Sequence, residues 1–275
     1  MSNVDYLSAA TGIAQDAGRL LEHYYERRIP YEYKAEFDLV TAADRASEKL
    51  VVEQLRSRFP SHSIISEEGG GIDKGPEYVW YVDPLDGTTN FAHGFPAFCV
   101  SIGLVHKGEL IAGVVYDPLR KELFSAEKGS GAYLNNRRIH VSSAGALGEG
   151  LFATGFASPR RHLDVNVYFF HQVSMLTHGI RRAGSAALDL CSVASGRLEG
   201  YWEFGLKTWD VAGGLLIVTE AGGRYGDMKG GPYELGGEHL VATNGAVHQE
   251  IVGLFHEIFE GRYRVPITPL TSSQV

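Results

Sequence analysis

Four strand-like segments follow one another closely in the first half of the sequence. They span residues 79–82, 98–105, 109–116 and 122–126, and the turn residues Lys107-Gly108 and Asp117-Pro118 stand between the last three. Short connections of this kind join neighbouring antiparallel strands, so the spacing predicts a meander. Any fold available to this chain must therefore contain an antiparallel sheet.

Helical patterns surround this meander. Apolar residues from Val4 to Tyr24 recur at steps of three, four or seven, which predicts an opening helix. Thr41-Ala42-Ala43-Asp44, a variant of the capping box, predicts a second helix that ends before Pro60. After about residue 145, expected helices (164–178, 185–195, 209–221, 246–260) alternate with expected strands (179–182, 201–203, 240–243). This alternation predicts stacked layers of helix and sheet.

The chain is long enough, at 275 residues, for one large core or two merged halves. We predict an N-terminal α+β half over residues 1–142, which contains the meander, and a C-terminal α/β half over residues 143–265. A tail over residues 266–275 follows. Because no long linker separates the halves, we expect them to form effectively one domain.

Composition excludes several classes of protein. The formal charge is -8, from 25 basic and 33 acidic residues, which argues against a general nucleic-acid or anionic-membrane surface. No apolar run approaches the roughly 18 residues of a membrane span, and the N-terminus lacks a signal-peptide pattern. Cys99 and Cys191 lie among apolar residues, which favours buried free thiols. We therefore expect a cytoplasmic protein.

Acidic residues gather where predicted elements begin or end. Glu67-Glu68 follows a short apolar run, Asp83 and Asp86 follow the strand 79–82, and Asp210 stands at a helix start. Any one cluster alone is most simply a turn or a helix cap. All three together offer the carboxylate oxygens that Mg²⁺ prefers, whereas neither cysteine has a partner at zinc-ligand spacing.

The loop after strand 79–82 adds features of an anion site. Pro84 restricts the loop, Gly87 permits close approach to the backbone, and Thr88 supplies a hydroxyl. The following Thr89-Asn90-Phe91 is expected to open a helix whose N–H groups receive an anion. Metal ligands beside an anion cradle indicate a site for a phosphate ester.

Two long motifs carry a family resemblance. Residues 79–91, VWYVDPLDGTTNF, and residues 209–214, WDVAGG, resemble the two signatures of the inositol monophosphatase family. Further likeness lies in residues 38–44, 66–68, 179–181, 184–187 and 219–223, so the resemblance covers residue 34 to about residue 245. It implies a layered αβαβα sandwich and a Mg²⁺-dependent phosphomonoesterase that forms a homodimer.

The resemblance also implies roles for individual residues. Two to three Mg²⁺ ions would be held by Glu67, Asp83, the carbonyl of Leu85, Asp86 and Asp210, and Li⁺ would inhibit by replacing one of them. Catalysis would involve Glu67, Thr88 and Asp44. Substrate would contact Gly87, Thr88, Gly184, Ser185, Ala186, Glu203 and Asp210.

In the family, an acid on the strand before the second signature contacts the ring hydroxyls of the substrate, and Glu203 stands at that position. The resemblance therefore implies inositol monophosphate as the substrate, since a carboxylate can accept hydrogen bonds from two neighbouring hydroxyls. Three related enzymes remain alternatives: fructose-1,6-bisphosphatase, 3'(2'),5'-bisphosphate nucleotidase and histidinol phosphatase. A bisphosphate would need a second basic pocket, for which Arg160, Arg161 and Lys207 are candidates. The alternative from another class is a regulatory protein that binds RNA polymerase or RNA, although the acidic charge makes nucleic acid an unfavourable partner.

Overall fold

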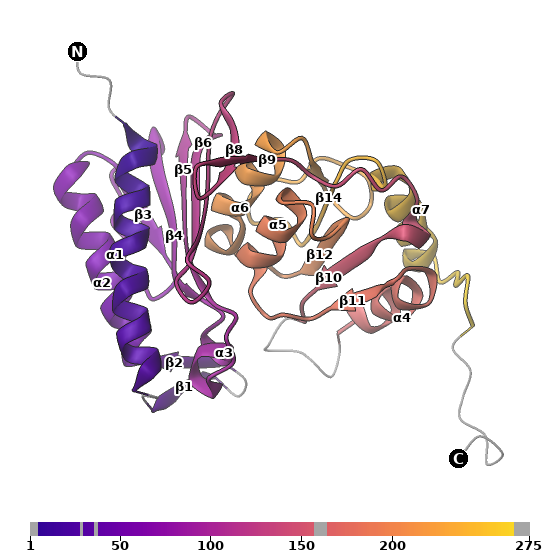
Figure 1. Ribbon diagram of the computed structural model, residues 1–275, viewed down its shortest axis with the longest axis horizontal. Helices are drawn as coiled ribbons and strands as arrows, with labels where there is room; N and C mark the ends of the chain where they lie inside the picture. Colours follow the sequence, from indigo (N-terminus) through magenta and orange to yellow (C-terminus); the bar gives the residue numbers. More distant parts are fainter. Residues whose placement is uncertain (1–4, 28–29, 36–37, 157–163, 267–275) are drawn as a thin grey trace.

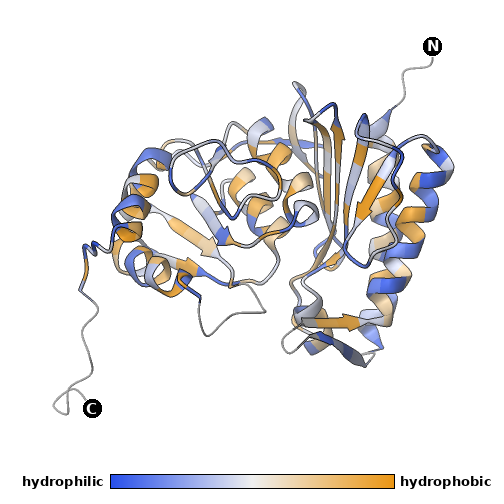
Figure 2. Ribbon diagram, turned by 180° about the vertical axis from the view of Figure 1, so that it is seen from behind, coloured by the Kyte–Doolittle hydropathy of each residue, from blue (hydrophilic) through white to orange (hydrophobic). Residues whose placement is uncertain are grey.

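The computed structural model describes residues 5–27, 30–35, 38–156 and 164–266, and in these residues the chain forms three β-sheets (Figure 1). Two long helices cover one side: α1 (Tyr6–Glu26) and α2 (Ala42–Arg58). The capping box predicted at Thr41 and Asp44 starts α2, and Pro60 follows its end. The buried residues of α1 are the apolar ones that its periodicity predicts, among them Ile13, Ala17 and Leu21, and Figure 2 shows polar residues on the outer side of the helices.

A seven-stranded sheet lies under these two helices, in the order β3-β4-β5-β6-β7-β8-β9. The pairs from β4 to β9 are antiparallel, which confirms the predicted meander, while β3 joins β4 in parallel. The strands are β3 (Ser63–Ser66), β4 (Tyr78–Asp86), β5 (Cys99–His106), β6 (Glu109–Asp117), β7 (Glu122–Glu127), β8 (Gly131–Leu134) and β9 (Arg137–Ile139).

The end of β4 differs from the prediction. The apolar pattern places the strand end at Val82, but β4 continues to Asp86, with a shift in its pairing to β5 between Asp83 and Asp86. Pro84 has no N–H to give to the neighbouring strand, so the ladder is interrupted there and resumes beyond it. The two acids therefore lie on the strand itself, one on each side of this irregularity.

A small hairpin stands at one end of the seven-stranded sheet. β1 (Tyr31–Ala35) and β2 (Asp38–Thr41) pair antiparallel, and the short helix α3 (Thr88–His93) lies beside β2 (Figure 1). The hairpin thus brings Lys34 and the start of α2 to the end of β4.

A five-stranded mixed sheet forms in the second half of the chain, in the order β11-β10-β12-β14-β13. A short 3-10 turn, η1 (Leu147–Glu149), precedes it. β10 is parallel to both β11 and β12, whereas β14 is antiparallel to β12 and β13. The strands are β10 (Leu151–Thr154), β11 (Gly179–Arg181), β12 (Gly200–Phe204), β13 (Arg224–Gly226) and β14 (His239–Thr243).

Helices complete the layers. α5 (Ala186–Ala194) and α6 (Thr208–Glu220) lie between the two large sheets and share one apolar cluster with both. α4 (Asn166–Leu176) and α7 (His248–Phe259) cover the other face of the five-stranded sheet. With α1 and α2 on the far side, the molecule is the predicted αβαβα sandwich (Figure 1).

α6 lies directly against the backbone of the seven-stranded sheet. A Cβ atom added to Gly103 on β5 would come within 2.7 Å of Ala212 on α6. A Cβ atom added to Gly113 on β6 would come within 2.5 Å of the carbonyl oxygen of Gly213 on the same helix. The missing side chains let the helix approach this closely. The first turn of α6, which contains Asp210, is therefore held at a fixed distance from β4 and β5.

No described helix is long and apolar enough to span a membrane. Cys99 and Cys191 are buried free thiols, as the sequence predicts. Of the predicted tail, residues 267–275 lie outside the described residues, and the division of the chain near residue 142 stays a prediction.

Candidate active site

The pairing irregularity in β4 positions two carboxylates and a carbonyl group. The Asp83 side chain is buried, and its Oδ1 accepts a hydrogen bond of 3.0 Å from the backbone N–H of Leu85. The Pro84 carbonyl accepts a bond of 2.7 Å from the Ser47 hydroxyl on α2. These bonds hold the segment in one conformation, because both of its otherwise unpaired backbone groups are satisfied.

Asp86 connects the seven-stranded sheet to α5. Its Oδ2 accepts hydrogen bonds from the Ser185 hydroxyl at 2.7 Å and from the backbone N–H of Ala187 at 2.8 Å. Ser185 is the N-cap of α5 and Ala186 is its first residue. The predicted residues Asp86, Ser185 and Ala186 therefore meet, although 99 positions separate the first two.

Gly87, Thr88 and Asp44 form a second group at the start of α3. Gly87 has a φ of 95°, and a Cβ there would lie 2.8 Å from the carbonyl oxygen of Ala97, so the turn requires glycine. The Thr88 hydroxyl lies 2.8 Å from Asp44 Oδ1 and 3.1 Å from the Leu85 carbonyl oxygen, and can donate to either. Burial raises the pKa of Asp44, while its hydrogen bonds to Thr41 and Thr88 oppose this effect.

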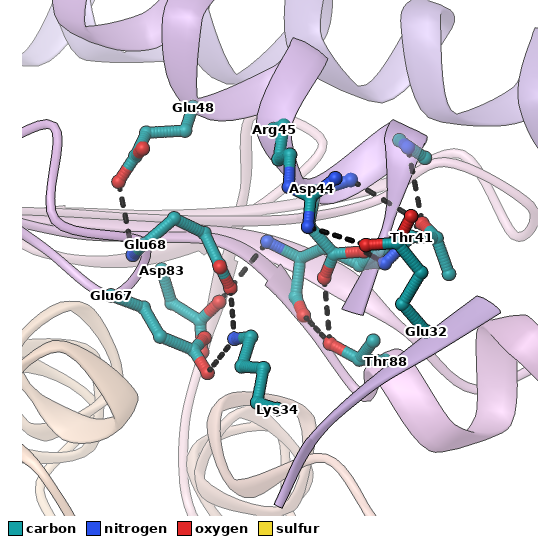
Figure 3. Close-up of polar contacts among 12 residues, drawn as sticks. Glu32, Lys34, Thr41, Asp44, Arg45, Glu48, Glu67, Glu68, Asp83 and Thr88 are labelled. Carbon is teal, nitrogen blue, oxygen red and sulfur yellow. Dashed lines mark hydrogen bonds and ion pairs between the residues drawn. The ribbon is translucent and has the colours of Figure 1, made fainter. Parts of the chain in front are cut away.

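Glu67 and Glu68 follow β3 and face the hairpin (Figure 3). The Lys34 ammonium lies 3.4 Å from Glu67 Oε1 and also contacts the Glu68 carboxylate. The backbone N–H of Glu68 donates to Glu48 on α2 at 3.0 Å. Desolvation outweighs the effect of Lys34 and raises the pKa of Glu67 to about 7.

Asp210 and Glu203 approach the same region from the second half of the chain. Asp210 lies in the first turn of α6, where its Oδ2 accepts a hydrogen bond of 2.7 Å from the backbone N–H of Lys207. Burial raises the pKa of Glu203 to about 7, and Asp86 adds to that increase. Glu203 in turn adds to the raised pKa of Asp210, so the two side chains share one electrostatic environment.

Asp83 lies at the centre of this acidic group. Burial raises the pKa of its carboxyl well above the usual range, and three neighbouring carboxylates add to the increase: Glu67, Asp86 and Asp210. Buried like charges are costly unless a cation compensates them. The donor set, carboxylates with one carbonyl group, is the set that hard divalent cations such as Mg²⁺ prefer, so these residues fit that ion.

In the described part of the chain, no three histidine, cysteine, aspartate or glutamate side chains form a group that could hold a metal ion as they stand. The predicted ligands share one region, but their metal-binding arrangement stays a prediction.

Asn90 contributes hydrogen bonds to the site, although the sequence analysis does not include it among the site residues. The Asn90 amide nitrogen on α3 lies 2.7 Å from the Ala97 carbonyl oxygen and 2.8 Å from that of Ala183, next to Gly184. It joins the two halves of the site, yet the sequence indicates only that Asn90 falls in the first turn of a helix. Of the basic residues considered for a second phosphate, Arg160 and Arg161 lie outside the described residues and Lys207 is exposed.

Comparison with known families gives one decisive match. A model of the inositol monophosphatase family matches residues 3–260 of the 275. The chain belongs to this family. Membership confirms the predicted family and enzyme class, a phosphatase, and the signatures that predicted it lie at the end of β4 and the start of α6.

Individual relatives of this inositol monophosphatase family member are similar to it over most of their length. The inositol-1-monophosphatase of Synechocystis sp. is 48% identical over 78% of this chain and 75% of its own length. The Nus factor SuhB of Pseudomonas aeruginosa is 46% identical over 86% of this chain and 91% of its own. The solved inositol monophosphatase of Anabaena (Nostoc) superposes with a TM-score of 0.82 at 44% identity, covering 90% of this chain and 94% of that one. These matches confirm the fold.

Proposed function

We propose that this protein is a Mg²⁺-dependent phosphomonoesterase that hydrolyses inositol monophosphate to inositol and phosphate. The observation that carries the proposal is the group of carboxylates around Asp83, drawn from both halves of the chain. Family membership supports the reaction class, and the chemistry of the donor set supports the metal.

Glu67, Asp83, Asp86, Asp210 and the Leu85 carbonyl would hold two to three Mg²⁺ ions. When bound, Mg²⁺ supplies positive charge against the phosphate and Lewis acidity. Hydrolysis of a phosphate ester requires mainly positioning and neutralisation of charge, so the protein needs no covalent nucleophile.

The protein's own groups would handle the proton and the phosphate. The Thr88 oxygen would take a proton from the attacking water while the Thr88 hydroxyl passes its own proton to Asp44 Oδ1, which lies 2.8 Å away. Desolvation makes Asp44 a stronger base than an exposed aspartate. The backbone N–H groups of Gly87 and Thr88 would bind the phosphate oxygens.

Glu203 would recognise the alcohol part of the substrate together with Gly184, Ser185 and Ala186. Its carboxylate lies close enough to Asp86 and Asp210 for their charges to interact, yet it stands on β12, away from the end of β4. A carboxylate in that position can accept hydrogen bonds from two neighbouring hydroxyls of a ring.

A turnover panel tests the proposal. Purified protein is assayed with and without Mg²⁺ on inositol monophosphate, fructose 1,6-bisphosphate, adenosine 3',5'-bisphosphate and histidinol phosphate. We expect Mg²⁺-dependent turnover with the highest kcat/KM on inositol monophosphate. A clear preference for one of the other three would reassign the substrate, and turnover unaffected by chelation would refute the metal.

A second candidate function is a regulatory one, because a relative 46% identical is named a Nus factor. Binding to RNA polymerase or RNA would be the corresponding role here. Pull-down of purified RNA polymerase by this protein, with Asp83→Asn as a catalytically inactive comparison, tests it independently of hydrolysis.

We also propose a cytoplasmic homodimer. The free thiols of Cys99 and Cys191 support a reducing compartment. Exposed apolar side chains on α4, among them Val167, Tyr168 and Met175, support a partner surface on that helix. Analytical ultracentrifugation tests the dimer, and Met175→Glu should shift the equilibrium toward monomer if α4 forms the contact.

A further inference from the structure

Glu203 is held from two sides by residues that the sequence-based site does not include. Tyr201 precedes it by two positions on β12, so both side chains project from the same face of the strand. The Tyr201 hydroxyl donates a hydrogen bond of 2.6 Å to Glu203 Oε2. The Tyr201 ring is fully buried in the apolar cluster shared with α5 and α6, so this donor has little freedom to move.

Gly155, which follows the neighbouring strand β10, limits the space available to the Glu203 carboxylate. β10 and β12 are parallel, with Thr154 opposite Trp202, which brings the next residue, Gly155, beside Glu203. A Cβ atom added to Gly155 would lie 2.0 Å from Glu203 Oε2 and 2.3 Å from Cδ. The carboxylate thus occupies the volume of the missing side chain, and any larger residue would displace it.

The backbone of Gly155 is itself fixed. Its carbonyl oxygen accepts a hydrogen bond of 2.7 Å from the Asn166 amide on α4, and the Asn166 side-chain oxygen accepts one of 2.6 Å from the Trp202 indole. Asn166 is fully buried. These hydrogen bonds fix the backbone of Gly155, and with it the wall against which the Glu203 carboxylate packs.

Charged neighbours and the hydrogen bond from Tyr201 both act on the Glu203 carboxylate. Burial raises the pKa of the Glu203 carboxyl, the bond from Tyr201 and the charge of Arg182 lower it, and Asp86 and Asp164 add smaller increases. The Tyr201 bond goes to Oε2, and no described residue donates a hydrogen bond to Oε1, which can therefore accept from substrate hydroxyls.

We propose that Tyr201 and Gly155 are positioning residues that determine substrate specificity: together they hold the Glu203 carboxylate where it can bind the hydroxyls of a polyol phosphate. The inference rests on the proposed function, because it assumes that Glu203 contacts the alcohol part of the substrate.

The test compares two substrates on five variants. Tyr201→Phe removes only the donor, Gly155→Ala displaces the carboxylate, and Glu203→Gln removes its charge. The double variant Tyr201→Phe/Glu203→Gln tests whether Tyr201 acts through Glu203. Tyr116→Phe is the matched control, a tyrosine almost as buried whose hydroxyl makes no hydrogen bond to a described residue. KM and kcat are measured on inositol monophosphate and on an aryl phosphate, which lacks the ring hydroxyls.

We expect Tyr201→Phe and Gly155→Ala each to raise KM for inositol monophosphate by about five-fold or more, with kcat and aryl phosphate hydrolysis nearly unchanged. The double variant should be no worse than Glu203→Gln alone, because Tyr201 has nothing left to position. Tyr116→Phe should match the wild type on both substrates, and the melting temperatures should confirm that every variant is folded.

If Glu203→Gln shows a loss on inositol monophosphate alone, three results would overturn the inference and leave the proposed function intact. These are a wild-type KM in both Tyr201→Phe and Gly155→Ala, equal losses of these two variants on both substrates, or additive losses in the double variant. If Glu203→Gln loses activity equally on both substrates, or loses none, the recognition role of Glu203 fails and the inference fails with it. If the wild type does not hydrolyse inositol monophosphate, the proposed function itself fails.

Discussion

At the scale of single residues, Asp83 combines burial with like charge from three neighbouring carboxylates, those of Glu67, Asp86 and Asp210. Asp83→Asn should lower kcat/KM by at least about 100-fold, because it removes a ligand charge from the proposed metal centre. Without metal the variant should be as stable as the wild type or more so, since a costly buried charge is gone. Steady-state kinetics and thermal unfolding in chelator measure the two effects. Wild-type turnover would show that Asp83 holds no catalytic ion.

Thr88 provides a residue-scale test of proton transfer. Thr88→Ala should lower kcat by about 10²–10⁴-fold with little change in KM, because the hydroxyl that joins the water to Asp44 is lost. Thr89→Ala is the matched control, since Thr89 is the next residue of α3 but is exposed. Equal kcat values for the two variants would refute the role of Thr88.

At the scale of elements, α6 depends on glycines in the sheet beneath it. Gly103→Ala would push a Cβ to within 2.7 Å of the α6 backbone and should destabilise the fold by about 1–3 kcal/mol. Gly12→Ala in α1, where nothing lies within 4 Å, should instead stabilise by about 0.5–1 kcal/mol. Urea unfolding measures both free energies. A neutral Gly103→Ala would mean that α6 shifts without cost.

His248, the first residue of α7, should make the stability of the fold depend on pH. Burial lowers the pKa of His248 to about 4, and its Nδ1 lies 3.0 Å from the Thr243 hydroxyl. Between pH 6.5 and 4 the unfolded chain binds a proton at this residue that the folded chain does not. The contribution of His248 to stability is therefore complete above pH 6.5 and falls as the pH decreases toward 4, by on the order of 3 kcal/mol.

Urea unfolding as a function of pH checks this expectation. His248→Gln should flatten the dependence between pH 6.5 and 4. His256→Gln, at an exposed position on the same helix, should leave the dependence unchanged. The same slope in His248→Gln as in the wild type would contradict the assignment.

The sequence predicts long elements better than short ones. The periodicity from Val4 to Tyr24 and the capping box at Thr41 predict α1 and α2 because each signal is local. β11, with three residues, matches the predicted strand 179–182, but the sequence does not predict β10 or β13, whose short segments are specified by pairing with distant strands. The continuation of β4 to Asp86 was missed for the same reason: Cys99 on β5, and not the local pattern, pairs with Asp86.

In the candidate site, too, some residues could be predicted from local sequence and others could not. The acids could be named in advance because their motifs are long and specific. The hydrogen bonds made by Asn90, Tyr201 and Gly155 could not, because each reaches a backbone or side-chain atom whose position depends on sheet register. Sequence patterns contain residue types and spacings, but not the register that brings β10 beside β12.

At the scale of the whole molecule, the predicted ions give an inhibition test. If Asp83, Asp86 and Asp210 hold a second Mg²⁺, Li⁺ should replace it after hydrolysis and trap the phosphate product. Inhibition should then be uncompetitive with respect to substrate. Initial rates at several Li⁺ and substrate concentrations decide the pattern, and competitive inhibition or none would contradict a second ion site of this composition.

The five-layered arrangement places the proposed chemistry and the proposed substrate recognition on different sheets. Asp83 and Asp86 lie on β4 of the seven-stranded sheet, Glu67 follows β3, and Asp210 lies on α6 between the sheets. Tyr201 and Glu203 lie on β12 of the five-stranded sheet, and Gly155 directly follows β10. A change on β12 or at the end of β10 can therefore alter which alcohol is accepted without moving the hydrolytic residues. Through this separation, an ancestor of this kind of protein could acquire new substrates by a few substitutions in one sheet while its reaction stayed the same.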